Sequence, residues 1–241
     1  MELKGPLKEG RFLKRYKRFF ADIDLDGELL VAHVPNTGSL RTCLFPDAPS
    51  IVTMSTDPKR KLKATLHFVK TPSGWAGVDT SLPNLLVFEA WEKGLLPHWS
   101  KLKAAKREYK LSKETRLDLV LAPNEKDLEE GKHLHFIEVK NVTYVDGKTA
   151  LFPDAVTTRG QKHLQELMEL RKKGFGAEIV FVVQRQGCEN FGPADEIDPV
   201  YGTLLRQAQA AGVKITALPC HFQIPSGIEL SSKPLKLLLD K

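Results

Sequence analysis

The chain has 241 residues, of which 41% are hydrophobic and 27% charged, a balance typical of a soluble globular protein with one large or two small domains. No apolar run reaches the roughly 20 residues of a membrane-spanning helix, and the N-terminus lacks the apolar core of an export signal. The three cysteines form no CxxC pair, which disfavours a zinc site or a disulfide framework. We therefore expect a cytoplasmic protein without a membrane partner.

The first eighty residues have the pattern of short strands separated by turns. Turn signals such as Asp26-Gly27 separate the apolar segments. Five short strands without a clear helix predict a small barrel, for example of the oligonucleotide-binding type, or a small sandwich, and periodicity does not separate the two. The predicted strands are 10–21, 29–34, 50–55, 64–70 and 75–79.

Basic residues concentrate in this N-terminal part, although the net charge of the whole chain is only +6. Seven Lys or Arg lie between Lys4 and Arg18 against one acid, and aromatic residues such as Tyr16 and Phe19 are interleaved with them. This combination suits a phosphate backbone with bases packed alongside; the alternative is a solvated face whose aromatic residues point into the core. The predicted nucleic-acid contacts are Arg11, Arg15, Lys17, Arg18, Lys59, Arg60 and Lys61.

Helices and strands alternate from about residue 81 onward. Helices are predicted after Ser81, after Thr157 or Thr158, and after Asp198, and each ends at a glycine. A charged segment, 124–132, is predicted to be a hairpin loop. The alternation predicts a mixed α/β sheet with helical crossovers, and so two domains, 1–80 and 81–241. The predicted strands are 108–111, 116–121, 133–140, 177–184 and 213–217.

The clearest candidate for a catalytic or metal-binding site is an acidic cluster. It consists of Asp118 and, twenty residues later, Glu138-Val139-Lys140. Glu138 and Lys140 project to the same side of a strand, and Asp118 meets them if the two strands are neighbours. Two carboxylates and a backbone carbonyl such as that of Val139 suit Mg²⁺ or Mn²⁺. Such an ion polarises a phosphodiester and lowers the pKa of an attacking water. The alternative is a solvent-facing charge pair on an amphipathic strand.

Four further residues are predicted to support this cluster. Glu89 offers another carboxylate, although it can instead pair with Lys93 one helical turn on. Arg159 suits a phosphate at a helix N-terminus, and Gln161 suits a carboxylate ligand or a phosphate. His163 is a candidate general base because its ordinary pKa is near neutrality; the alternative is a surface or capping residue.

The blocks around these residues resemble the sugar fermentation stimulation protein family. They follow the family's order and span the chain from about residue 11 to about residue 212. The matched blocks are Arg15–Phe19, His33–Gly38, Arg116–Asp118, Ile137–Lys140, Phe152–Thr157 and Arg159–Leu164.

The resemblance implies an α+β chain: an N-terminal oligonucleotide-binding-type barrel followed by an α/β PD-(D/E)xK nuclease-like domain with a mixed sheet. It assigns the nuclease motif to Asp118, Glu138 and Lys140, with Glu89 and Gln161 in support. The proline that often precedes the first acid in that superfamily is Leu117 here.

The resemblance also implies largely sequence-non-specific DNA binding and a part in regulating sugar (maltose) utilisation genes. Asn36, in one of the matched blocks, therefore joins the predicted DNA contacts. The alternative function is a divalent-metal-dependent nuclease that hydrolyses phosphodiester bonds with the acidic cluster. The sequence leaves the oligomeric state open, with a homodimer as one option.

Overall fold

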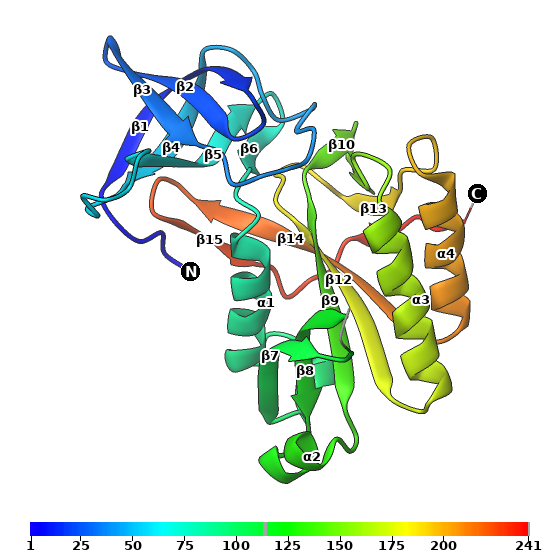
Figure 1. The fold of residues 1–241 in the computed structure, drawn as a ribbon. Helices are drawn as coiled ribbons and strands as arrows, with labels where there is room; N and C mark the ends of the chain where they lie inside the picture. Colours follow the sequence, from blue (N-terminus) through cyan, green and yellow to red (C-terminus); the bar gives the residue numbers. More distant parts are fainter. Residues whose placement is uncertain (113–114, 241) are drawn as a thin grey trace.

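The computed structural model describes residues 1–112 and 115–240, which form a small barrel and a larger mixed-sheet domain (Figure 1). The barrel sheet has the order β3-β2-β1-β4-β5-β6, and a parallel contact between β3 and β5, at Ala32 and Ala64, closes it into a ring. This confirms the expected oligonucleotide-binding-type barrel. Its strands are β1 (Leu7–Tyr16), β2 (Phe20–Leu25), β3 (Glu28–His33), β4 (Ala48–Met54), β5 (Ala64–Thr71) and β6 (Gly74–Gly77).

The single strand predicted at 10–21 is wrong, because the chain reverses direction there. Lys17 and Arg18 have φ angles of 47° and 61° and form the turn between β1 and β2. Tyr16 pairs with Phe20, so the turn has three residues, 17–19. Hairpin positions with positive φ usually hold Asn or Gly, so the sequence carries no signal for this turn. The Arg15 guanidinium stabilises the turn by donating a 2.6 Å hydrogen bond to the Arg18 carbonyl.

The second domain is built on a six-stranded sheet with the order β15-β14-β12-β9-β8-β7. β12 runs parallel to both β9 and β14, and the outer pairs are antiparallel, so the predicted mixed sheet is confirmed. The strands are β7 (Ala104–Lys110), β8 (Arg116–Ala122), β9 (His135–Val142), β12 (Gly176–Val183), β14 (Lys214–Gln223) and β15 (Gly227–Leu230).

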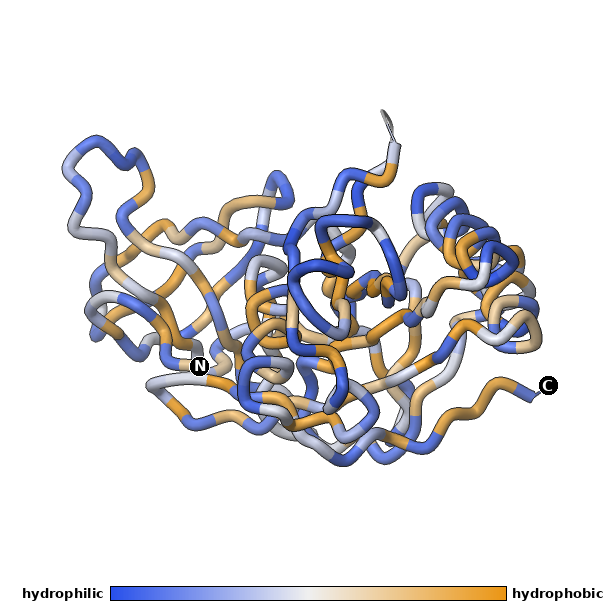
Figure 2. The backbone as a smooth tube through the Cα atoms, turned by 90° about the horizontal axis from the view of Figure 1, so that it is seen from below, coloured by the Kyte–Doolittle hydropathy of each residue, from blue (hydrophilic) through white to orange (hydrophobic). Residues whose placement is uncertain are grey.

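Helices cover both faces of this sheet. α1 (Leu82–Glu92) packs on one face, and α3 (Thr158–Lys172) and α4 (Pro199–Ala210) pack on the other (Figure 1). Hydrophobic and hydrophilic positions alternate along the two helices at the right of Figure 2, as expected for helices with one buried stripe. Each face therefore has its own apolar core, and the two cores hold the central strands in place. None of the helices in the described part of the chain is long and apolar enough to cross a membrane.

Several parts of the second domain differ from the sequence prediction, among them the edge strand β15, which was not predicted. The expected loop at 124–132 contains α2 (Glu125–Glu130), which Asn124 caps by accepting a 2.9 Å hydrogen bond from the Asp127 amide. A second, four-stranded sheet was not predicted, nor was a 3-10 turn, η1 (Pro97–Trp99). The small sheet comprises β10 (Tyr144–Asp146), β11 (Thr149–Phe152), β13 (Asn190–Pro193) and β16 (Lys236–Leu237).

Candidate functional site

The acidic cluster lies where β8 and β9 separate. Their pairing begins at Leu119 opposite Ile137, and Asp118 is the next residue outward. Its carboxylate accepts a 2.8 Å hydrogen bond from the Val139 amide and another of 2.8 Å from the Asn84 side chain. The strand separation thus leaves the Asp118 carboxylate beside the backbone of β9, as the pairing of these two strands predicted.

Asp118 has a raised pKa, of about 6. Burial disfavours its charged form most, and the charge of Glu138 adds to this effect, whereas the hydrogen bonds from Val139 and Asn84 oppose it. Two carboxylates held this close repel each other when both are ionised. A bound cation would relieve that repulsion.

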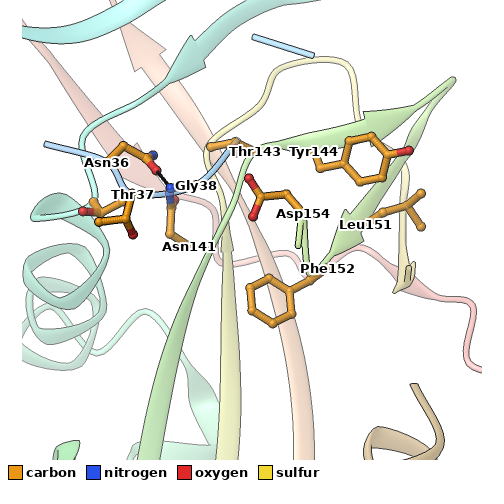
Figure 3. Close-up of a pocket in the computed structure, with 10 residues that line it drawn as sticks. Asn36, Thr37, Gly38, Asn141, Thr143, Tyr144, Leu151, Phe152 and Asp154 are labelled. Atoms are coloured by element: carbon orange, nitrogen blue, oxygen red, sulfur yellow. Dashed lines mark hydrogen bonds between the residues drawn. The ribbon is translucent and has the colours of Figure 1, made fainter. Parts of the chain in front are cut away.

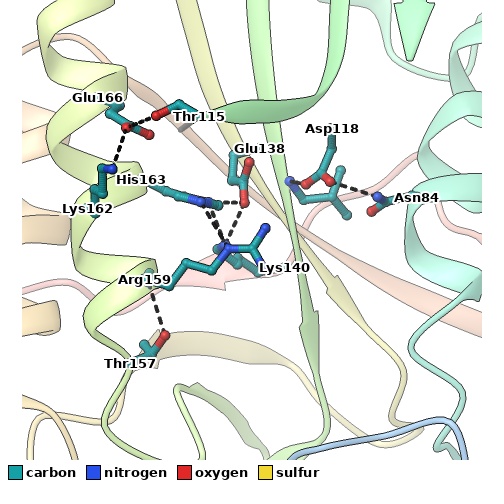
Figure 4. A network of polar contacts seen from close by, with 12 residues as sticks. Asn84, Thr115, Asp118, Glu138, Lys140, Thr157, Arg159, Lys162, His163 and Glu166 are labelled. Carbon is teal, nitrogen blue, oxygen red and sulfur yellow. Dashed lines mark hydrogen bonds and ion pairs between the residues drawn. The ribbon is translucent and has the colours of Figure 1, made fainter. Parts of the chain in front are cut away.

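Glu138 sits on the other side of the cluster and is 3% exposed. Lys140 donates a 2.6 Å hydrogen bond to its Oε1, and Nδ1 of His163 contacts the same oxygen (Figure 4). Burial acts to raise the pKa of Glu138, but the hydrogen bond from His163 and the charge of Lys140 outweigh it and lower the pKa. Glu138 is therefore held as an anion.

A divalent cation fits these residues. Within the part of the chain that the structure describes, Glu138 Oε2 is buried without a hydrogen-bond partner, and such an uncompensated anionic oxygen is costly. No group of three or more His, Cys, Asp or Glu among the described residues is arranged to hold a metal. The site thus offers two carboxylates and backbone oxygen, a set that suits Mg²⁺ because this ion keeps several of its waters.

The site is an open cleft of about 280 Å³ between α1 and α3. Arg159, an exposed residue of the first turn of α3, lines it, and its Nε lies 3.4 Å from Nε2 of His163. α1 contributes Asn84, which was not among the predicted site residues. The available signal was that Asn84 is the one polar residue in the apolar stretch Leu82–Phe88.

Two of the predicted supporting residues contact other groups. The Glu89 carboxylate lies 3.1 Å from the N-terminal amine and 2.9 Å from Nζ of Lys93, so its helix turns it away from Asp118. Gln161 donates hydrogen bonds of 2.9 and 3.1 Å to Asp198, the residue that caps α4. The structure therefore joins Arg159 and His163 to the cluster, but not Glu89 or Gln161.

Four of the predicted DNA contacts are engaged within the barrel, two of them at the turn that contains Gly38. Arg15 donates to the carbonyls of Asn36, Gly38 and Arg18 at 2.6 to 2.9 Å. Asn36 is 4% exposed; its amide donates to the Val78 carbonyl and its Oδ1 accepts from the Gly38 amide. Both side chains hold the turn that contains Gly38 in place.

The other predicted contacts lie in two separate places. Lys17 and Arg18 are exposed beside the turn at Gly38. Lys59 and Lys61 are exposed in the connection from β4 to β5, which does not line the acidic cleft. Arg11 pairs with Asp24, and Arg60 donates to the hydroxyl of Thr65.

The fold and the site together define a class: an oligonucleotide-binding-type barrel joined to a mixed-sheet domain with paired carboxylates at the end of its sheet. Residues 13–78 match the family model described as the SfsA N-terminal OB domain. Residues 81–226 match the model described as the sugar fermentation stimulation protein RE domain. The chain belongs to the sugar fermentation stimulation protein family, as its sequence blocks indicated.

Relatives align with almost the whole chain. A sugar fermentation stimulation protein homolog of Bdellovibrio bacteriovorus is 48% identical and covers 98% of this chain and 99% of its own length. A homolog of Geotalea uraniireducens is 45% identical, with coverage of 97% and 98%. The solved structure of Pyrococcus furiosus SfsA in complex with Ca²⁺ is 30% identical, with a TM-score of 0.85 and coverage of 99% and 98%.

Proposed function

We propose that the protein binds DNA and that its second domain is a PD-(D/E)xK-type, divalent-metal-dependent nuclease domain. The observation that carries this proposal is the pair of carboxylates, half-buried Asp118 and buried Glu138, with Lys140 beside them and one Glu138 oxygen left without a partner. The structural relative from Pyrococcus furiosus, solved in complex with Ca²⁺, adds support, because that ion also prefers oxygen ligands.

Asp118, Glu138 and the carbonyl of Val139 are the residues that would hold Mg²⁺ or Mn²⁺. Such a cation would polarise a phosphodiester and stabilise the charge that develops during its hydrolysis. Lys140 contributes a cation at the same place and orients Glu138, which His163 holds from the α3 side. The exposed guanidinium of Arg159 suits a phosphate oxygen at the rim.

DNA binding is expected to be largely independent of sequence, because lysine and arginine contacts to phosphate carry no sequence information. The exposed residues Lys17, Arg18, Lys59 and Lys61 supply this charge. The affinity should therefore fall steeply as the salt concentration rises. A fluorescence anisotropy titration of a DNA duplex at several salt concentrations tests this, and an affinity that hardly changes with salt would contradict it.

We also propose the division into a barrel at 1–80 and a nuclease-like domain at 81–241, since β6 ends at Gly77 and α1 begins at Leu82. The cytoplasmic location and the homodimer stay predictions. Light scattering of the purified chain would decide whether it forms a dimer.

Calorimetry tests the metal site without relying on activity. Mn²⁺ should bind the native chain, and Asp118→Asn and Glu138→Gln should weaken the binding at least tenfold. Glu89→Gln is the matched control, because its carboxylate pairs with Met1 and Lys93 outside the cleft. Equal Mn²⁺ affinity in all four proteins would rule out this site.

Cleavage is then tested on DNA, RNA and branched substrates with Mg²⁺ or Mn²⁺. Asp118→Ala and Lys140→Ala should each abolish it. Cleavage that survives both substitutions would place the activity elsewhere, and no cleavage under any condition would leave only DNA binding.

DNA binding without cleavage is the second candidate, and one observation favours it. Nζ of Lys140 already lies 2.6 Å from Glu138, so one of the two carboxylates is neutralised within the chain itself. The suggested regulation of sugar (maltose) utilisation genes agrees with this function. It predicts intact DNA binding in Glu138→Gln and no Mn²⁺ binding in the native chain.

A further inference from the structure

Three neighbouring depressions lie in the surface between the barrel and the acidic cleft, and each shares lining residues with the next. The first, of about 610 Å³, lies beside the β1–β2 turn; the second is about 160 Å³; the third is the acidic cleft, of about 280 Å³. Thr37 and Gly38 line both the first and the second, and Thr80 and Asn141 line both the second and the third. We call this row of adjoining depressions the groove.

The narrow middle section of the groove is held firmly. Its wall is the turn from Asn36 to Gly38, fixed by Arg15 on the barrel side. On the other side, the Asp154 carboxylate accepts a 2.7 Å hydrogen bond from the Ser39 amide. A Cβ on Gly38 would lie 2.6 Å from that carboxylate, so the bare backbone of the turn packs against the second domain (Figure 3). The section is thus preformed.

Positive charge lies at both ends of the groove. Lys17 and Arg18 are exposed at the wide end, and Arg159 is exposed at the acidic cleft. The one carboxylate of the middle section, that of Asp154, is near Arg15, whose charge it attracts. Phe19, which is 41% exposed, adds an aromatic surface next to Arg18. The groove thus has cationic ends for phosphates, and Phe19, just outside the residues that line its barrel end, offers a ring on which a base can stack.

The size of the middle section suits one ring system. A protein cavity of about 150 Å³ holds one benzene ring, so the middle section, of about 160 Å³, has room for a single unpaired base. We propose that the groove binds one unpaired DNA strand, which runs from the β1–β2 turn past Thr37 into the acidic cleft. This inference rests on the proposed function and names its substrate class: DNA with a single-stranded segment.

Thr37 offers the sharpest test, since it is exposed and lines both the wide and the narrow section. Thr37→Trp should block the groove, and Thr37→Ser is the matched control at the same position. Anisotropy is measured without divalent ions, on a labelled single strand and on a blunt duplex of the same sequence. The native chain should bind the single strand at least tenfold more tightly than the duplex. Thr37→Trp should lose at least tenfold on the single strand and less than twofold on the duplex, and Thr37→Ser should match the native chain.

Phe19→Ala provides a second variant on the barrel. It should weaken single-strand binding about fivefold or more through lost stacking, while Leu29→Ala, which removes another exposed apolar residue of the barrel, should have no effect. Circular dichroism confirms that each variant is folded.

The outcomes separate the two proposals. A native chain that binds duplex as tightly as single strand, or single-strand binding that survives Thr37→Trp, overturns the groove while DNA binding stands. A native chain that binds neither form of DNA overturns the proposed function together with the groove.

Discussion

Two buried glutamates on neighbouring strands of the same sheet differ in how completely their charge is compensated. Glu138 of β9 and Glu178 of β12 are 3% and 0% exposed, and they belong to adjacent positions of the parallel ladder. Glu178 has donors on both carboxylate oxygens, whereas Glu138 has one oxygen without a partner in the described part of the chain. Burial of a carboxylate alone therefore does not distinguish the proposed site; the incomplete compensation of Glu138 does.

The environment of Glu178 explains the difference. Its Oε2 accepts from Nε1 of Trp99 at 2.9 Å and lies 3.1 Å from Nε2 of both His98 and His135, and Thr216 donates to its Oε1. Burial acts to raise its pKa, but the hydrogen bonds, from His135 first, lower the pKa to about 2. By contrast, Glu138 is close enough to the carboxylate of Asp118 to raise the pKa of that residue. The charge of Glu178 is therefore compensated within the fold, whereas the proposed function assigns to a cation the compensation that Glu138 and Asp118 lack.

The largest expected effect is on stability at the compensated cluster. Glu178→Ala leaves Trp99 and Thr216 as buried donors without an acceptor and should lower the free energy of unfolding by about 3–5 kcal/mol. Urea denaturation measures this, with Glu178→Gln as a milder control that keeps the side-chain shape. A loss below about 1 kcal/mol would mean that the two glutamates do not differ as described.

Lowering the pH should decrease the free energy of unfolding, because Glu178 becomes protonated. Its pKa is about 2 in the folded protein against an ordinary value of 4.5, so its contribution is complete above pH 4.5 and is lost as the pH falls from 4.5 towards 2. The size of this contribution is roughly 3 kcal/mol. Urea midpoints between pH 6 and pH 2.5 should fall more steeply for the native chain than for Glu178→Gln. Parallel curves would show that Glu178 is not involved.

Asp118 should behave in the opposite way. Its pKa is about 6 in the folded protein against an ordinary 3.8, so its ionised form destabilises the fold, and this cost shrinks as the pH falls from 6 towards 3.8. Asp118→Asn should therefore raise the unfolding free energy at pH 7.5 by about 2 kcal/mol, although it removes a proposed metal ligand. Mn²⁺ should stabilise the native chain but not the variant. A variant less stable than the native chain at pH 7.5 would show that Asp118 supports the fold.

Most of the fold was predictable because its elements carry local signals. The helix opened by Thr157 and the helix opened by Asp198 both have capping side chains that accept from the backbone amide three residues later, and such caps are visible in sequence. The turn at Lys17 and Arg18 has no such signal. Its positive φ angles depend on Arg15, whose hydrogen bond to the Arg18 carbonyl forms only in the folded barrel.

Part of the candidate site was likewise predictable from local sequence, and part of it was not. The alternation of side chains along a strand predicted that Glu138 and Lys140 lie on one side of β9. The pairing of β8 with β9 predicted that Asp118 lies near them. Asn84 and Glu178 could not be predicted as members of polar clusters, because their partners come from elements 34 and up to 80 residues away. The choice between Asn84 and Glu89 depends on the rotation of α1 against the sheet, which long-range packing sets.

Glu89 therefore gives the smallest expected effect and tests that rotation. Its carboxylate is 25% exposed and is paired with the N-terminal amine and Lys93, and such pairs contribute about 0.5 kcal/mol. Glu89→Gln should lower the unfolding free energy by no more than this and leave Mn²⁺ affinity unchanged. Asn84→Ala should instead weaken Mn²⁺ binding severalfold, because it frees the Asp118 carboxylate from its 2.8 Å hydrogen bond. The reverse result, with Glu89 affecting the metal and Asn84 not, would mean that α1 presents its acid to the cleft.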